Sequence, residues 1–209
     1  MQTPTLFDLG PSEQLAAAIS TTNSRALQKI QGLAYAPDYI SKDEEAQLLH
    51  EIDANPWSTE LSRRVQHYGY KYDYKARSID PSMRLGELPN WLQKLAHRLH
   101  QENHFERPPD QVIANEYLPG QGIAPHIDCE PCFGGTVATL SIGSTAIMHF
   151  ANETEKLPVF LEQRSLAILK GEARYNWTHG IAKRKKDTIE NYVIPRARRV
   201  SLTFRLVVV

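Results

Sequence analysis

Three potential metal ligands, two close together and one far along the chain, constrain the fold of this sequence more than any other feature. They are His126, Asp128 and His179. Side chains two residues apart share a face of an extended strand, so His126 and Asp128 can bind one ion from a single strand end. Two imidazoles and one carboxylate on one face of a metal are typical of a mononuclear non-haem iron(II) site. We therefore expect a fold that returns His179 to that strand end.

The residues before His179 indicate how the chain returns. Residues 165–169 form a short, largely apolar run, and residues 171–179 follow it after a break. This pattern predicts a strand, a turn and a second strand. Such a connection can bring His179 to the same end of a barrel as His126.

The C-terminal segment 199–205 alternates polar and apolar residues, which predicts a strand with two different faces. One face would carry Arg199, Ser201, Thr203 and Arg205, and the other Val200, Leu202 and Phe204. Two arginines that point into a barrel are costly unless they meet anions. Their shared face therefore favours a dicarboxylate ligand.

Four motifs in a fixed order resemble the AlkB family of iron(II)/2-oxoglutarate dioxygenases. They are the segment from Asn115-Glu-Tyr117 to His126-Ile-Asp128, then Ser141-Ile-Gly143, then Gly171-Glu-Ala-Arg-Tyr-Asn-Trp-Thr-His179, and finally Arg199-Val-Ser-Leu-Thr-Phe-Arg205. The resemblance begins near Gln31, so we expect an N-terminal extension over residues 1–30 and the dioxygenase domain over residues 31–209. It implies an α+β fold with a double-stranded β-helix (jelly-roll) core, N-terminal helices and a nucleotide-recognition lid.

The resemblance also implies the reactants and the residues that hold them. These reactants are Fe(II), 2-oxoglutarate and O2. The catalytic metal ligands would be His126, Asp128 and His179, and 2-oxoglutarate would bind to Asn115, Tyr117, Arg199, Ser201 and Arg205. Arg199 and Tyr117 would take the far carboxylate, and Arg205 and Asn115 would serve the end near the metal.

Four tyrosines alternate along one short segment: Tyr68, Tyr70, Tyr72 and Tyr74. With this spacing they can share one face of a strand or hairpin. Such a face, with Arg64 nearby, suits stacking on a flipped or single-stranded base. The alternative is a packed hairpin that only covers the barrel. The resemblance favours the lid, with Arg64, Tyr68, Tyr70 and Tyr72 as substrate contacts.

The charges are balanced over the whole chain but not locally. Lys plus Arg and Asp plus Glu number 24 each, whereas residues 183–199 hold seven basic and two acidic residues. A solvated loop is the ordinary explanation for the run Lys183–Lys186. Beside the mouth of a metal site, the same run could instead neutralise a nucleic-acid backbone.

Two cysteines and an acidic residue follow the first two metal ligands. Cys129 and Cys132 are expected to be free, partly buried thiols, because zinc needs two further ligands and a disulfide is disfavoured in a reducing cytosol. Glu130 is either an exposed loop residue or a contact to the substrate. In that second role its carboxylate would suit a cationic methylated base.

Helices are expected before the strand-rich half, which begins near Gln111. Ser41-Lys-Asp-Glu44 is a capping box and predicts a helix up to about Ala54. A second helix is predicted within Leu88–His104. Short helices are expected at Leu15–Ile19 and Ala26–Ile30, and Gln2–Leu9 is either a surface-packed arm or a docking peptide.

A chain of 209 residues with 41% hydrophobic residues can bury the core of one domain. Its sequence has no membrane-spanning run and no secretory leader, so we expect a cytoplasmic monomer. The expected function is oxidative dealkylation (demethylation) of alkylated bases in single-stranded DNA or RNA, that is, direct-reversal repair. The alternatives are hydroxylation of a modified nucleoside in transfer RNA, oxygenation of a protein or small molecule, and a binding module without turnover.

Overall fold

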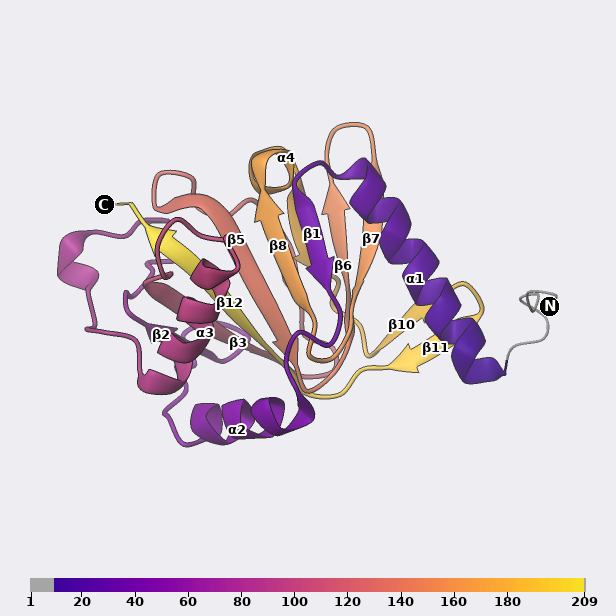
Figure 1. The fold of residues 1–209 in the computed structure, drawn as a ribbon, viewed down its shortest axis with the longest axis horizontal. Coiled ribbons are helices and arrows are strands. Elements are labelled where there is room, and N and C mark those ends of the chain that lie inside the picture. Colours follow the sequence, from indigo (N-terminus) through magenta and orange to yellow (C-terminus); the bar gives the residue numbers. More distant parts are fainter. Residues whose placement is uncertain (1–9, 209) are drawn as a thin grey trace.

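The computed structural model describes residues 10–208, which form two antiparallel sheets with helices around them (Figure 1). The larger sheet has the strand order β1 (Leu33–Ala36), β8 (Leu166–Lys170), β5 (Phe133–Ile142), β12 (Arg199–Val207), β3 (Gln111–Tyr117) and β2 (Val65–Tyr68). The smaller sheet has the order β4 (Ile123–His126), β9 (Thr178–Ile181), β6 (Ala146–Ala151) and β7 (Lys156–Leu161). A separate hairpin joins β10 (Lys186–Ile189) to β11 (Tyr192–Pro195). This architecture confirms the predicted α+β fold with a jelly-roll core.

Four α-helices and one short 3-10 helix accompany the sheets in the described part of the chain. They are α1 (Pro11–Lys29), α2 (Lys42–Asp53), η2 (Pro81–Met83), α3 (Asn90–Gln101) and α4 (Gly171–Tyr175). The capping box predicted for α2 is present, since the Ser41 hydroxyl accepts from the Glu44 amide and the Glu44 carboxylate accepts from the Ser41 amide. Among residues 10–208, no helix is both long and apolar enough to cross a membrane.

One face of the larger sheet packs against helices, and the other lines a cavity. Val200, Leu202 and Phe204 of β12 point to the outer face, where α2 and α3 cover them (Figure 1). The helices contribute Leu48, Ile52, Leu92, Leu95 and Leu99 to this core. Because side chains alternate along β12, Arg199, Ser201, Thr203 and Arg205 all line a cavity on the inner face. The predicted division of this strand is confirmed.

The N-terminal helix is longer than its apolar residues indicated. The sequence predicted two short helices, whereas α1 runs without a break from Pro11 to Lys29. The polar centre of α1 is held to β7, because the Asn23 side chain donates to the Phe160 carbonyl at 3.0 Å and accepts from the Phe160 amide at 2.7 Å. The possible docking peptide Gln2–Leu9 lies outside the described residues.

The connection to His179 also differs in detail from its prediction. The expected turn between two strands is the short helix α4, between β8 and β9. Its sequence Gly-Glu-Ala-Arg-Tyr contains good helix formers, which favour one helical turn over an open loop. The strand β9 still returns His179 to the end of β4, where it pairs directly with His126.

Candidate metal and co-substrate site

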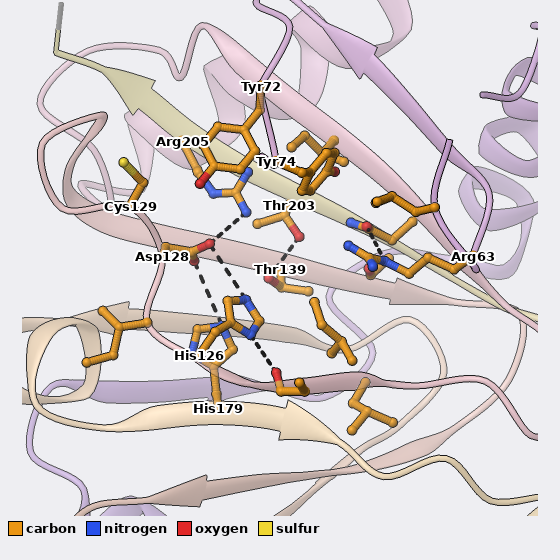
Figure 2. A pocket seen from close by; sticks show the side chains of 18 of the residues that line it. Arg63, Tyr72, Tyr74, His126, Asp128, Cys129, Thr139, His179, Thr203 and Arg205 are labelled. Atoms are coloured by element: carbon orange, nitrogen blue, oxygen red, sulfur yellow. Dashed lines mark hydrogen bonds and ion pairs between the residues drawn. The ribbon is translucent and has the colours of Figure 1, made fainter. Parts of the chain in front are cut away.

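A cavity of about 290 Å³ lies between the two sheets and is lined by the residues predicted to bind the metal and 2-oxoglutarate (Figure 2). The larger sheet lines it with side chains of β3, β5 and β12, and the smaller sheet with side chains of β4, β6 and β9. Asn115, Tyr117, His126, Asp128, His179, Arg199, Ser201 and Arg205 all contribute to its wall. Alternation in the paired strands therefore collects ligands from distant parts of the chain at one place.

The three predicted metal ligands meet at one end of this cavity. His126 Nε2 lies 4.0 Å from one carboxylate oxygen of Asp128, and His179 Nε2 lies 3.9 Å from the other. One ligand atom from each residue lies within 4.8 Å of the other two. This spacing and donor set fit a divalent iron bound by two imidazoles and a carboxylate.

Both histidines turn Nε2 toward the carboxylate of Asp128. The Nδ1 atom of His126 lies 2.9 Å from the Ala124 carbonyl, which can only accept, so Nδ1 holds the proton and Nε2 keeps its lone pair. Burial lowers the pKa of His179 to about 4, against the raising effect of Asp128. His179 is therefore neutral at physiological pH, as a metal ligand must be.

Asp128 is ionised although it is buried. Burial alone would raise its pKa, but Arg205, His179 and His126 together bring it below its ordinary value. Arg205 donates to one carboxylate oxygen at 2.9 Å, and its guanidinium lies 4.6 Å from the centre of the Phe133 ring. Arg205 thus holds a metal ligand in place.

Arg199 offers an anion site at the other end of β12. Its Nη2 donates to the Ser141 hydroxyl at 2.7 Å, whereas Nε and Nη1 are buried and have no partner among residues 10–208. Burial lowers its pKa to about 10, while Tyr117, whose ring centre lies 5.5 Å from the guanidinium, raises it. A buried guanidinium with two unused donors fits the far carboxylate of 2-oxoglutarate.

The lid differs from the predicted row of tyrosines. Strand β2 ends at Tyr68, and Gly69 turns the chain with a φ of 78° at a point where a Cβ would lie 1.8 Å from the Asp110 carbonyl oxygen. The alternation is therefore interrupted after Tyr68. Tyr72 and Tyr74 line the cavity and contact each other edge to face, with ring centres 5.1 Å apart.

Four of the expected substrate contacts do not line the cavity. Tyr68 packs against Trp91 in the outer core, and Tyr70 packs beside the cluster around Phe133. Arg64 is bound to Glu116 by two hydrogen bonds of 2.6 and 2.7 Å. Glu130 is exposed and absent from the lining. Of the residues proposed as substrate contacts, Tyr72 alone is part of the wall.

The expectation of free thiols is wrong. Cys129 and Cys132 form a disulfide bond, with their Cα atoms 5.3 Å apart. A tight turn brings them together, since the amides of Cys132 and Phe133 both donate to the Cys129 carbonyl. Redox compartment and zinc ligation did not predict this bond, because it depends on the local turn.

Two arginines that sequence reasoning did not select also belong to the site. Arg174 is buried and donates to the carbonyls of Asp128, Cys129, Phe133 and Gly134, so it holds the loop that carries a metal ligand. Arg63 lines the cavity where Arg64 was expected. No sequence signal singled out Arg174, and Arg63 and Arg64 cannot be distinguished without the register of β2.

Comparison with known proteins agrees with this geometry. A family profile described as "2OG-Fe(II) oxygenase superfamily" matches residues 26–205. The chain is 30% identical to the "Probable RNA/DNA demethylase ALKBH6" of Danio rerio, covering 82% of this chain and 83% of that protein. The solved structure of OsALKBH1 superposes with a TM-score of 0.66 at 19% identity, covering 84% of this chain and 96% of that one.

A further relative is longer than the chain. The "tRNA (carboxymethyluridine(34)-5-O)-methyltransferase alkbh8" of Xenopus tropicalis is 38% identical over 76% of the chain, but the match spans only 26% of that protein. The chain therefore matches about a quarter of the length of that relative.

Proposed function

Since the chain belongs to the AlkB family within the 2OG-Fe(II) oxygenase superfamily, we propose that it oxidises an alkyl substituent on a base of DNA or RNA. It is an Fe(II)/2-oxoglutarate-dependent dioxygenase, with O2 as the second co-substrate. His126, Asp128 and His179 would hold the iron, and Arg199 with Tyr117 and Ser201 would hold 2-oxoglutarate. When bound, iron and 2-oxoglutarate supply the oxidising chemistry, with succinate and CO2 as by-products.

The aromatic wall of the cavity carries this proposal. Tyr72, Tyr74 and Phe133 form an aromatic surface in which neighbouring ring centres are 5.1 and 5.7 Å apart. A base that has left its stack can lie against such a surface. Tyr72 and Phe133 would thereby orient one substituent of the base toward the metal, while the apolar wall excludes water.

Two outcomes of the same oxidation follow from the position of the substituent. Hydroxylation of an N-methyl carbon gives an unstable carbinol that releases formaldehyde, which is demethylation and can serve direct-reversal repair of alkylated DNA or RNA. Hydroxylation of a side chain attached to a ring carbon leaves a stable alcohol, as in the modification of transfer RNA. The name of the Danio relative supports demethylation, and the name of the Xenopus relative supports a transfer-RNA substrate.

Succinate release in the presence of different stimulants tests the proposal. The protein is incubated with Fe(II), ascorbate and 2-oxoglutarate, and then with methylated single-stranded DNA, bulk transfer RNA or a peptide mixture. We expect a nucleic acid to stimulate succinate release in the wild type and not in Asp128→Ala. Stimulation by peptides and by neither nucleic acid would contradict a nucleic-acid substrate while leaving the dioxygenase intact.

A further inference from the structure

Arg63 lies in the cavity as a cation without an anionic partner. Its Nε donates to the Asn115 side chain at 2.9 Å, and its guanidinium lies 5.8 and 6.0 Å from the ring centres of Tyr74 and Tyr117. Within residues 10–208 its two terminal nitrogens make no hydrogen bond or ion pair. The Asn115 contact and the two rings fix the side chain in place, so its free donors keep a defined position at the cavity wall.

The cavity wall carries more positive than negative charge, and Arg63 is part of that excess. Arg63, Arg77, Arg199 and Arg205 line the wall, and among the described lining residues Asp128 is the only carboxylate. Arg205 is paired with Asp128. With Arg199 assigned to a carboxylate of 2-oxoglutarate, Arg63 and the exposed Arg77 remain.

This excess discriminates between classes of modified base. A base that methylation has made cationic would be placed in a cavity with unpaired positive charge. It would find no free carboxylate there, because Glu130 is exposed outside the lining. A neutral base avoids that repulsion, and an anionic group would gain a charged hydrogen bond from Arg63.

Resting on the proposed function, we propose that Arg63 determines substrate specificity by binding an anionic group of the target nucleotide, either a carboxylate on the base substituent or its own phosphate. Figure 2 shows Arg63 across the cavity from Asp128. When the reactive carbon of a nucleotide faces the metal ligands, an anionic group that lies on the Arg63 side of that carbon would meet the guanidinium. If the anion is a carboxylate on the base substituent, the preferred bases are anionic first, neutral second and cationic last; if it is the phosphate, anionic and neutral bases bind alike.

Binding of matched probes tests this order without turnover. The protein is loaded with Mn(II) and 2-oxoglutarate in the absence of oxygen, and dissociation constants are measured for short oligoribonucleotides that differ at one base. The probes carry 5-carboxymethyluracil, its neutral methyl ester, or the cationic 1-methyladenine. The free nucleosides of the first two form a further arm that lacks phosphate.

The variants are Arg63→Gln, which removes the charge, and Arg63→Lys, which keeps it. Arg25→Gln, on the exposed side of α1, removes one charge away from the cavity. We expect the wild type and Arg25→Gln to prefer the carboxymethyl probe to its ester by about tenfold or more, the ratio expected for one charged hydrogen bond. Arg63→Gln should lose that preference and Arg63→Lys should retain part of it, while the dissociation constant of 2-oxoglutarate stays within about twofold of wild type.

The remaining outcomes are separable. If the ester and acid oligonucleotides bind equally to wild type but Arg63→Gln weakens both, and the nucleosides do not bind, the anion is the phosphate and the inference holds in that form. If Arg63→Gln weakens 2-oxoglutarate instead, Arg63 is a co-substrate ligand and the inference is wrong. If Arg63→Gln changes no dissociation constant, the inference also fails, although nucleic-acid binding stands. If wild type binds no probe but a nucleic acid stimulates succinate release, this inference fails and the proposed function stands; if no nucleic acid stimulates succinate release either, both fail.

Discussion

At the scale of single residues, the cavity is built from charges that are held in place before any ligand binds. Arg205 keeps Asp128 ionised, and burial keeps His179 neutral. Arg199 is different, since two of its donors are buried and lack partners in the described part of the chain. Such a group costs stability unless an anion binds it, which makes Arg199 the sharpest indicator of the co-substrate.

Replacing Arg199 by Met should weaken 2-oxoglutarate binding by about 10- to 100-fold, because it removes a charged hydrogen-bond donor from the carboxylate. Folding should be preserved, since an apolar side chain of similar size tolerates burial. Calorimetric titration of the Mn(II)-loaded protein with 2-oxoglutarate measures the change. An unaltered dissociation constant would show that the far carboxylate binds elsewhere.

His67 should make stability depend on pH. Burial, with a contribution from Lys71, lowers its pKa in the folded protein to about 4. The unfolded chain has the ordinary histidine value and therefore binds more protons between pH 6.5 and about 4. The free energy of unfolding should fall as the pH drops through this range. In His67→Gln the fall between pH 7.5 and 5 should be smaller by about 1 kcal/mol, allowing for partial exposure; parallel curves in urea titrations would contradict this.

At the scale of elements, the strands that carry the site approach one another more closely than ordinary side chains permit. Gly180 of β9 lies where a Cβ would be 2.8 Å from the Pro125 nitrogen and 3.0 Å from the Ile123 carbonyl oxygen of β4. Because β4 and β9 carry His126 and His179, their separation sets the distance between two metal ligands. A glycine is required at this approach.

Gly180→Ala should therefore separate β4 from β9, lowering stability by about 1–3 kcal/mol and weakening metal binding. Gly135→Ala is the matched control, because its Cβ would meet only the Tyr175 hydroxyl at 3.5 Å. Co(II) titration followed by absorbance measures the affinity. Equal affinities in the two variants would show that this close approach does not position the ligands.

The elements also show what the sequence could predict. The faces of β12 were predictable because polar and apolar residues alternate from Arg199 to Leu206. The approach of His179 to His126 followed from ligand chemistry. The course of the lid was not predictable, since the chain at Gly69 packs against the carbonyl of Asp110, which is distant in sequence. Which of Arg63 and Arg64 faces the cavity also depends on a contact distant in sequence, namely the register of β2 against β3.

At the scale of the whole molecule, α1 is attached to the core. Ala26 and Ile30 belong to a buried cluster with strands of both sheets, and Asn23 is bonded to both backbone groups of Phe160. The expected boundary at residue 30 remains a prediction. These contacts favour α1 as a structural part of the domain.

Asn23→Ala should lower the free energy of unfolding by about 1–3 kcal/mol, because it leaves buried groups of β7 without a partner. Thr21→Ala, at an exposed position on the same helix, should change it by less than about 0.5 kcal/mol. Urea titrations compare the two variants. Equal stabilities would show that α1 can detach without cost to the sheets.

The most direct measurement is mass spectrometry of nucleosides from nucleic acid treated with the protein. Methylated single-stranded DNA and RNA and bulk transfer RNA are incubated with Fe(II), 2-oxoglutarate and isotopically labelled O2, beside Asp128→Ala. We predict that one nucleoside loses a methyl group or gains one labelled oxygen, only with the wild type. Consumption of 2-oxoglutarate with every nucleoside unchanged would contradict a nucleic-acid substrate and direct the search to proteins.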